Sequence, residues 1–139
     1  MTEAATVRLL LWRVGGARCG APLEQLREVL PAMPLARIPG AAAAVSGVAN
    51  VRGELVTVVD GRTLLGEADT TPAEAIVLVR VGRRTVGLAV DEVEDLVTVS
   101  DAVLLPGSQS AAAWTVQVDD GAVVRLLDLE GLLGPLFQG

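Results

Sequence analysis

The chain has 139 residues, with 17 acidic and 11 basic side chains and a formal net charge of −6. This length suits one domain with a hydrophobic core of its own. The acidity argues against binding to nucleic acid, because that affinity depends on neutralising phosphates. Histidine and lysine are absent and Cys19 is the one cysteine, which excludes histidine triads, histidine metal sites, lysine Schiff bases and an internal disulfide. We expect no catalytic residue, no metal, no cofactor and a reducing, cytoplasmic location.

Apolar residues make up 51% of the chain, yet no apolar run approaches the roughly 18 residues of a membrane span. The first apolar run follows an acidic residue rather than a basic cluster, unlike that of a signal peptide. We therefore expect no membrane insertion and no export by that route.

Short runs of alternating or continuous apolar residues, separated by glycine-containing turns, predict a mainly β fold. The expected strands cover residues 7–14, 18–22, 48–52, 54–59, 75–81, 84–90, 93–99, 114–118 and 122–127. Glycine and aspartate tolerate tight chain reversals. Turns are accordingly expected at Gly15-Gly16, Arg52-Gly53, Gly82-Arg83 and Asp119-Asp120-Gly121.

Two short helices are expected in the first third of the chain. Apolar residues at helical spacing predict one over residues 23–30, which Pro31 would end. An alanine-rich stretch predicts a turn or two of helix over residues 41–46.

Two further helices are expected behind aspartates. Asp60 and Asp128 each stand directly before a short apolar run, where an aspartate can accept hydrogen bonds from the free N–H groups of a first helical turn. The runs end at Gly66 and Gly134, and glycine is the residue that most often closes a helix. We expect a structural role for both aspartates.

The chain contains a weak internal repeat. Residues 13–30 resemble residues 80–97, and residues 53–66 resemble residues 121–134, at nearly one offset and in the same order. Such a repeat predicts two similar subdomains. Coincidence in a sequence so rich in valine, leucine and glycine is the alternative.

The expected subdomains are residues 14–66 and 75–134, joined by a linker over 66–74, with exchange of a terminal strand allowed for. Each is expected to be a small β barrel, because closure removes exposed sheet edges. Barrels of this size are marginal alone, so the two should share a buried interface. Residues 136–139 are consistent with the remnant of a purification tag and are placed outside the domain of residues 1–135.

The stretch from Arg37 to Asp60 carries a recognisable motif. It contains an arginine, an apolar residue and a proline, then a glycine-valine pair, an N-x-R-G unit, further apolar residues and an aspartate. The matching residues are Gly47, Val48, Asn50, Arg52, Gly53, Val56, Val58 and Asp60. This motif resembles the signature of the CheW family, and with matching flanks the resemblance spans about residues 7–134. Thr57 and Gly61 depart from it, since the family usually has proline and an apolar residue there.

The resemblance implies a mainly β fold of two five-stranded barrels of the Src-homology-3 type, in a pseudo-two-fold arrangement with a few short helices. It also implies a non-catalytic adaptor. Proteins of the CheW family couple the cytoplasmic signalling tips of chemoreceptors, the methyl-accepting chemotaxis proteins, to the regulatory domain of a CheA-type histidine kinase. We expect these two partners, and a protein that is a monomer on its own.

By the same resemblance, six residues are candidates for receptor binding: Arg52, Asn50, Leu26, Glu28, Val86 and Gly87. Each has a structural alternative. For the two charged residues it is a solvated surface, for the asparagine it is organisation of the turn, and for the three others it is packing.

Other polar and small residues are expected to serve the fold. Gly53 suits the backbone angles of a turn, and Cys19 suits a small apolar packing position. The densest charge cluster consists of Asp91, Glu92, Glu94 and Asp95. A solvated strand edge is the expected role of this cluster, and a surface for a basic partner is the alternative.

Two other functions stay open beside the adaptor. A small-ligand or peptide-binding β barrel outside chemotaxis would need a deep apolar pocket. An enzyme could use paired carboxylates, for example Asp91 with Asp128, although neither lies in a recognisable catalytic context.

Overall fold

The computed structural model describes residues 7–66, 72–99, 103–104, 113–117 and 123–137. The strands of these residues are β1 (Val7–Val14), β2 (Ala17–Pro22), β3 (Leu26–Pro31), β4 (Val45–Val51), β5 (Glu54–Asp60), β6 (Ala75–Val81), β7 (Arg84–Val90), β8 (Glu92–Val99), β9 (Val103–Leu104), β10 (Ala113–Gln117) and β11 (Val123–Leu127). The helical segments are η1 (Leu23–Gln25), α1 (Gly61–Leu65), α2 (Leu129–Leu133) and η2 (Gly134–Phe137).

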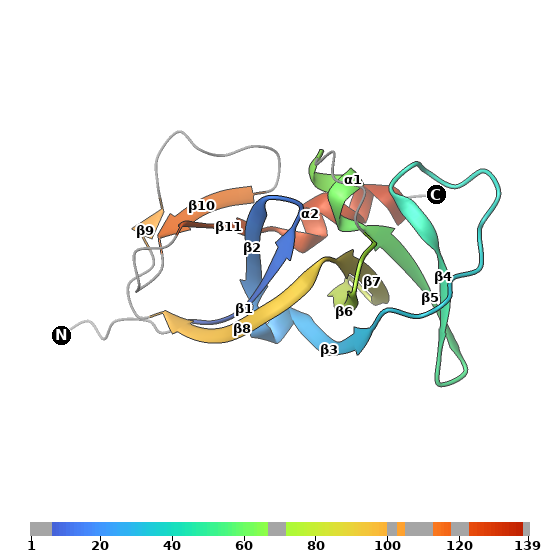
Figure 1. Cartoon of the computed structure of the whole chain (residues 1–139), viewed down its shortest axis with the longest axis horizontal. Coiled ribbons are helices and arrows are strands. Elements are labelled where there is room, and N and C mark those ends of the chain that lie inside the picture. The colour runs from blue at the N-terminus through green and yellow to red at the C-terminus, as the bar shows by residue number, and fades with distance from the viewer. Residues whose placement is uncertain (1–6, 67–71, 100–102, 105–112, 118–122, 138–139) are drawn as a thin grey trace.

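The strands form two sheets (Figure 1). One has six strands in the order β8-β1-β2-β11-β10-β9, and the other has five in the order β3-β6-β7-β5-β4. The predicted mainly β class is therefore confirmed. The predicted number of five strands is found in one sheet only, because the two-residue β9 adds a sixth strand to the other. Among the described residues, the edge strands of each sheet are not paired with one another, so neither sheet closes as a hydrogen-bonded barrel.

Each sheet combines strands from both halves of the chain. The β6–β7 hairpin lies between β3 and β5, and the β1–β2 hairpin lies between β8 and β11. Two of these neighbouring pairs, β5 with β7 and β11 with β2, run parallel. A whole hairpin is thus exchanged from each half, not a terminal strand alone, and residues 14–66 and 75–134 describe the sequence repeat rather than the sheets.

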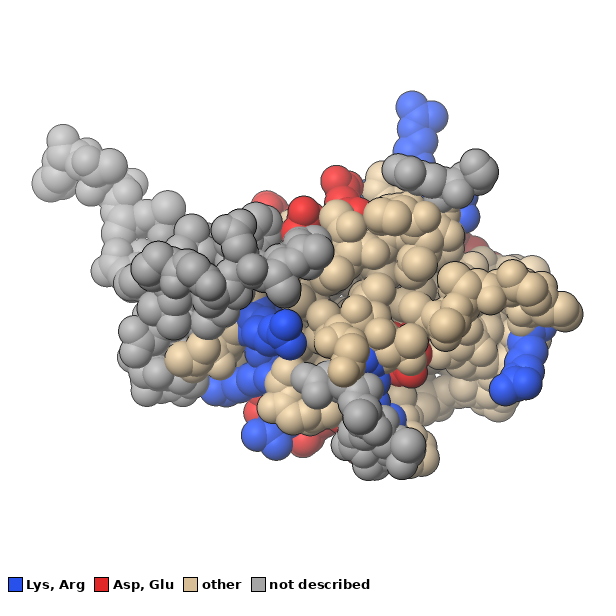
Figure 2. Space-filling view, turned by 90° about the horizontal axis from the view of Figure 1, so that it is seen from above, with Lys and Arg blue, Asp and Glu red and all other residues tan. Residues whose placement is uncertain are grey.

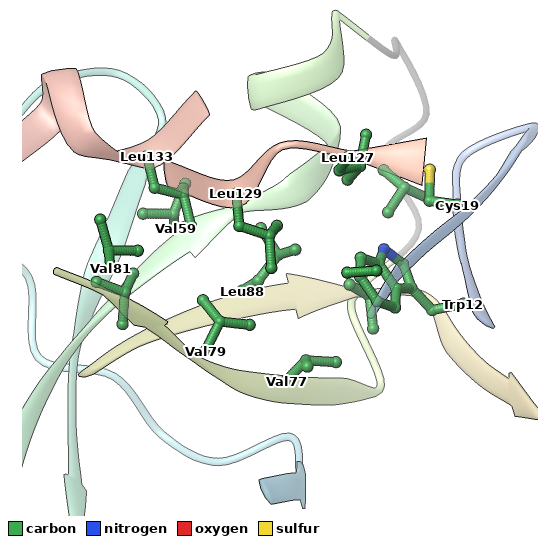
Figure 3. Packing of buried hydrophobic residues seen from close by; sticks show 14 residues of the cluster. Trp12, Cys19, Val59, Val77, Val79, Val81, Leu88, Leu127, Leu129 and Leu133 are labelled. Atoms are coloured by element: carbon green, nitrogen blue, oxygen red, sulfur yellow. The ribbon is translucent and has the colours of Figure 1, made fainter. Parts of the chain in front are cut away.

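One hydrophobic core lies between the sheets (Figure 3). Trp12 and Cys19 enter it from the six-stranded sheet, Val79 and Leu88 from the five-stranded sheet, and Leu129 from α2. All five are essentially excluded from solvent. The expected shared interface is present, and Cys19 occupies the packing position predicted for it.

The segment expected as a helix over residues 23–30 is largely a strand. Only η1 is helical, and β3 follows it directly, hydrogen-bonded along β6. Half-buried and exposed residues alternate along β3, which is the period of a strand with one covered face. In so short an apolar run the helical and strand periods are difficult to tell apart. Backbone hydrogen bonds to β6 make this segment a strand.

The alanine-rich stretch 41–46 is not helical either. Ala41, Ala42 and Ala43 are exposed, and β4 already begins at Val45. A few alanines without a buried face lack the tertiary packing that stabilises a short helix.

Both predicted aspartate caps are present. Asp60 accepts hydrogen bonds from the Arg62 N–H at 3.2 Å and from the Thr63 hydroxyl at 2.7 Å. Asp128 accepts from the Gly131 N–H at 3.2 Å. These bonds satisfy donors at the first turns of α1 and α2.

The predicted closing glycines behave differently. Gly66 ends α1 in the left-handed conformation, with φ of 74°. Gly134 keeps right-handed angles, and the chain continues into η2. The prediction that this helix ends at Gly134 is confirmed, since Gly134 is the C-cap of α2, although without the left-handed conformation. Leu136 and Phe137 of η2, which were predicted to lie outside the domain, lie against the core between the sheets.

Several predicted strand bounds and turn positions agree with the structure. β1, β6 and β7 have the predicted bounds, and turns are present at Gly15-Gly16, Arg52-Gly53 and Gly82-Arg83. β9 was not expected, because two residues carry no periodicity. The predicted turn at 119–121 and most of the linker over 66–74 lie outside the described residues.

Gly61→Ala is a test of close packing at α1. Helix propensity alone would make alanine about 1 kcal/mol more favourable. A Cβ at this position would instead lie 2.7 Å from the Ala89 carbonyl oxygen and 3.2 Å from Val14 Cγ2. We expect a loss of about 1–3 kcal/mol in unfolding free energy, measured by urea denaturation. The control is Gly16→Ala, which meets no atom within 4 Å, and a gain in stability at Gly61 would contradict this account.

Candidate functional site

The β4–β5 turn has a backbone conformation that exposes Arg52. Arg52 and Gly53 both have positive φ, 52° and 86°, as the favoured two-residue hairpin turn requires. Asn50 holds the turn, since its Oδ1 accepts a hydrogen bond from the Gly53 N–H at 2.8 Å. Asn50 and Gly53 thus have the turn-forming roles that the sequence suggested.

Arg52 reaches from this turn to Glu28 on β3. Its Nη1 donates to Glu28 Oε2 at 3.0 Å and its Nη2 to Oε1 at 2.5 Å, which is the bidentate geometry of a strong arginine–carboxylate pair. β3 and β4 are the two edges of the five-stranded sheet. The pair therefore links the turn that follows one edge strand to the other edge strand of this sheet.

The pair keeps both charges accessible. The side chain of Arg52 is 68% exposed and that of Glu28 is 35% exposed. The hydrogen bond from Arg52 lowers the pKa of Glu28 below its usual 4.5, and the hydrogen bond to Glu28 raises the pKa of Arg52. Exposed pairs contribute little to stability, so this one forms a fixed, charged surface feature rather than a folding determinant.

The other three candidates are buried or half-buried in the structure. Val86 is fully buried in the core between the sheets, and Leu26 is half-buried against the same core. Gly87 is buried as well, and a Cβ there would lie 2.9 Å from Ile76 Cγ2. The structure thus brings Arg52, Asn50 and Glu28 together, whereas Val86 and Gly87 offer no side-chain surface to a partner.

Two exposed apolar residues lie on β3 and on the β4–β5 hairpin, which carry the Arg52–Glu28 pair, but on the sheet face opposite Glu28. Leu55 on β5 is 73% exposed and Val29 on β3 is 44% exposed. The alternation of Val56 and Val58 along the predicted strand could have identified Leu55 as outward-facing. The structure shows both valines buried and Leu55 exposed. We name Asn50, Arg52 and Glu28 the hairpin surface.

The acidic cluster is divided between surface and interior. Glu94 lies 2.9 Å from Arg18 and 3.6 Å from Arg13 at the surface. Asp91 stands between β7 of one sheet and β8 of the other, where its Oδ2 accepts from the Gly15 N–H at 2.7 Å. The predicted solvated edge therefore holds for Glu94 but not for Asp91.

Arg62 of α1 is the partner of Asp91. Its Nε donates to Asp91 Oδ1 at 2.6 Å, and its Nη2 also contacts that oxygen. The side chains are only 9% and 18% exposed. Asp91 is thereby committed to the fold, and no sequence motif singled out Arg62.

Residues other than Lys, Arg, Asp and Glu form most of the described surface on the face seen from above in Figure 2, with basic and acidic residues in small separate groups. Within the described residues, no three potential metal-ligating side chains gather. No helix in that part of the chain is long and apolar enough to cross a membrane.

Comparison with known proteins identifies the same family as the sequence motif. Residues 8–135 match the family model described as the CheW-like domain. The chain belongs to the CheW-like family. Membership confirms the predicted resemblance and the role of a chemotaxis coupling adaptor that comes with it.

Relatives match over nearly their full length. A chemotaxis protein CheW of Rhizobium meliloti is 33% identical over 132 residues, covering 89% of this chain and 85% of its own. The protein FrzA of Myxococcus xanthus is 34% identical over 131 residues, covering 88% and 82%. The crystal structure of the scaffolding protein TtCheW from Thermoanaerobacter tengcongensis superposes with a TM-score of 0.83 at 18% identity, covering 93% of both chains, and supports the CheW fold.

Asp91→Asn tests the buried pair. The amide can still accept from the Gly15 N–H, but it leaves the Arg62 guanidinium buried without a counter-charge. Breaking a buried pair in this way costs about 3–5 kcal/mol, which we expect as a loss in unfolding free energy.

The adjacent exposed acid provides the matched control. Glu92→Gln should change stability by less than about 0.5 kcal/mol. Adding Arg62→Met to Asp91→Asn should recover most of the loss, because an apolar side chain tolerates burial. Equal losses for the two single carboxylate variants would contradict a special role for Asp91.

The pKa of Glu28 tests the surface pair. Because Arg52 lowers that pKa, the pair is fully formed above pH 4.5 and is lost as the pH falls through the lowered value. An NMR titration of the Glu28 carboxyl should show a return toward 4.5 in Arg52→Gln. Arg27→Gln removes a charge with a smaller effect on this pKa and should change it less. An unchanged Glu28 titration in Arg52→Gln would show that the pair does not form in solution.

Proposed function

We propose that this protein couples the signalling tips of chemoreceptors to the regulatory domain of a CheA-type histidine kinase, in the cytoplasm and without catalysis of its own. The hairpin surface is the proposed receptor contact. The observation that carries this assignment is the exposed, bidentate Arg52–Glu28 pair at a turn held by Asn50.

The physical features of this surface suit a protein partner. Leu55 supplies an exposed apolar side chain on the hairpin that carries Arg52, and protein interfaces combine apolar with polar residues. The turn is preorganised by its own hydrogen bond, so little conformational entropy is lost on binding. Weak individual contacts suffice, because partners gathered in an array raise the effective concentration.

Calorimetry with the separate partners tests the assignment. We expect Arg52→Glu to weaken binding of a soluble receptor tip at least about tenfold, since a charge-assisted contact becomes a repulsive one. Binding of the kinase regulatory domain should stay within about twofold of that of the unchanged protein. Arg8→Glu, an exposed arginine on the other sheet, is the matched control and should affect neither partner.

A charge exchange separates a partner contact from a purely structural pair. The double variant Arg52→Glu with Glu28→Arg restores the pair with its charges reversed. If the pair only holds the hairpin to β3, this variant recovers receptor binding; we expect it to stay defective. Recovery would overturn the receptor contact while leaving the adaptor role to the kinase measurement.

A further inference from the structure

The β6–β7 turn forms a second, basic surface. Arg83 and Arg84 follow each other at the hairpin tip and are both exposed. They border an open hollow of about 600 Å³, whose other walls include Glu130 of α2 and Phe137 of η2. The hollow therefore combines two cations, an acid and an aromatic ring.

Arg84 is held in position by an aromatic contact. Its guanidinium carbon lies 4.8 Å from the centroid of the Phe137 ring. Stacking on an aromatic face fixes the guanidinium plane but leaves the N–H donors at its edge available for a carboxylate. In the part of the chain that the structure describes, neither Arg83 nor Arg84 pairs with an acid; the ion pairs there involve Arg13, Arg18, Arg52 and Arg62.

The acid of the hollow is turned toward the backbone. Glu130 Oε1 accepts a hydrogen bond from the Gly82 N–H at 3.3 Å. The negative charge therefore lies toward the turn, and the guanidinium edge of Arg84 is left without a described counter-charge. A carboxylate arriving at the hollow would be attracted by the arginines and repelled by Glu130.

This hollow and the Arg52–Glu28 pair belong to opposite faces of the five-stranded sheet. Arg84 stands opposite Val81 in the β6–β7 register, and Val81 faces the core that contains α2. Glu28 stands opposite Leu78 in the β3–β6 register, and Leu78 belongs to the separate cluster on the other face. Directly opposed residues share a face, so the two surfaces can be occupied independently.

We propose that the hollow at the β6–β7 turn is a docking site for an acidic peptide segment of a partner protein. Carboxylates of the segment pair with Arg83 and Arg84, and an apolar side chain of the segment lies against Phe137. Charge complementarity favours this occupant. A protein with a net charge of −6 repels an acidic partner over most of its surface, so a basic turn would fix the orientation of binding.

Fluorescence anisotropy with the labelled peptide Glu-Asp-Leu-Glu-Asp tests the proposal on the full chain. We expect Arg84→Gln to weaken binding at least about tenfold, the loss typical of a charge-assisted hydrogen-bonded contact. Arg80→Gln is the matched control: Arg80 is an exposed residue of the same hairpin, one position from Val81 and therefore on the opposite face. It removes the same charge and should change affinity by less than about twofold.

A third variant is expected to strengthen peptide binding rather than weaken it. Glu130→Gln keeps an acceptor for the Gly82 N–H but removes the repelling charge, and we expect binding to strengthen about two- to fivefold. Absence of binding to the unchanged protein, or equal losses for Arg84→Gln and Arg80→Gln, would overturn the site. The peptide measurement uses neither receptor nor kinase. A negative result in it would leave the proposed adaptor function standing, and a negative result in the calorimetry would leave this peptide site standing.

Discussion

The contact between Arg62 and Asp91 is the interaction on which the arrangement of the two sheets most depends. Asp91 lies where the chain leaves the five-stranded sheet for the six-stranded one, and its carboxylate receives both Arg62 of α1 and the Gly15 N–H of the β1–β2 turn. A buried pair of this kind contributes little net stability but is costly to break. The pair therefore links α1, the β1–β2 turn and the junction between β7 and β8 through one carboxylate.

The repeat places a hairpin-turn glycine, Gly15 or Gly82, at equivalent positions, and a different acidic side chain accepts the hydrogen bond from each backbone N–H. In the first half, the Gly15 N–H is held through Asp91, which Arg62 neutralises. In the second half, Glu130 of α2 accepts directly from the Gly82 N–H. Both arrangements tie a helix to a hairpin turn. The difference leaves the Gly82 turn without a buried cation and with exposed arginines beside it.

The two proposed surfaces follow from hairpin turns that project from a shared core. The β4–β5 turn presents Arg52, fixed by Glu28, and the β6–β7 turn presents Arg84, fixed by Phe137. In each case a neighbour orders the guanidinium without burying it. The loss of side-chain entropy on binding is reduced, which suits an adaptor that meets several partners with modest affinity at each contact.

Local patterns along the chain were enough to predict the mainly β class, most strands, three of the turns, both aspartate caps and the family, because alternation, glycine turns, capping and the motif depend on residues close together in the sequence. The sequence also singled out Arg52 and Glu28 separately. Tertiary structure alone decided that they pair, that residues 26–31 form a strand, that Val86 and Gly87 are buried, and that whole hairpins are exchanged. Those outcomes depend on which distant strand supplies the hydrogen bonds and the covering side chains, and neither local propensity nor periodicity specifies that partner.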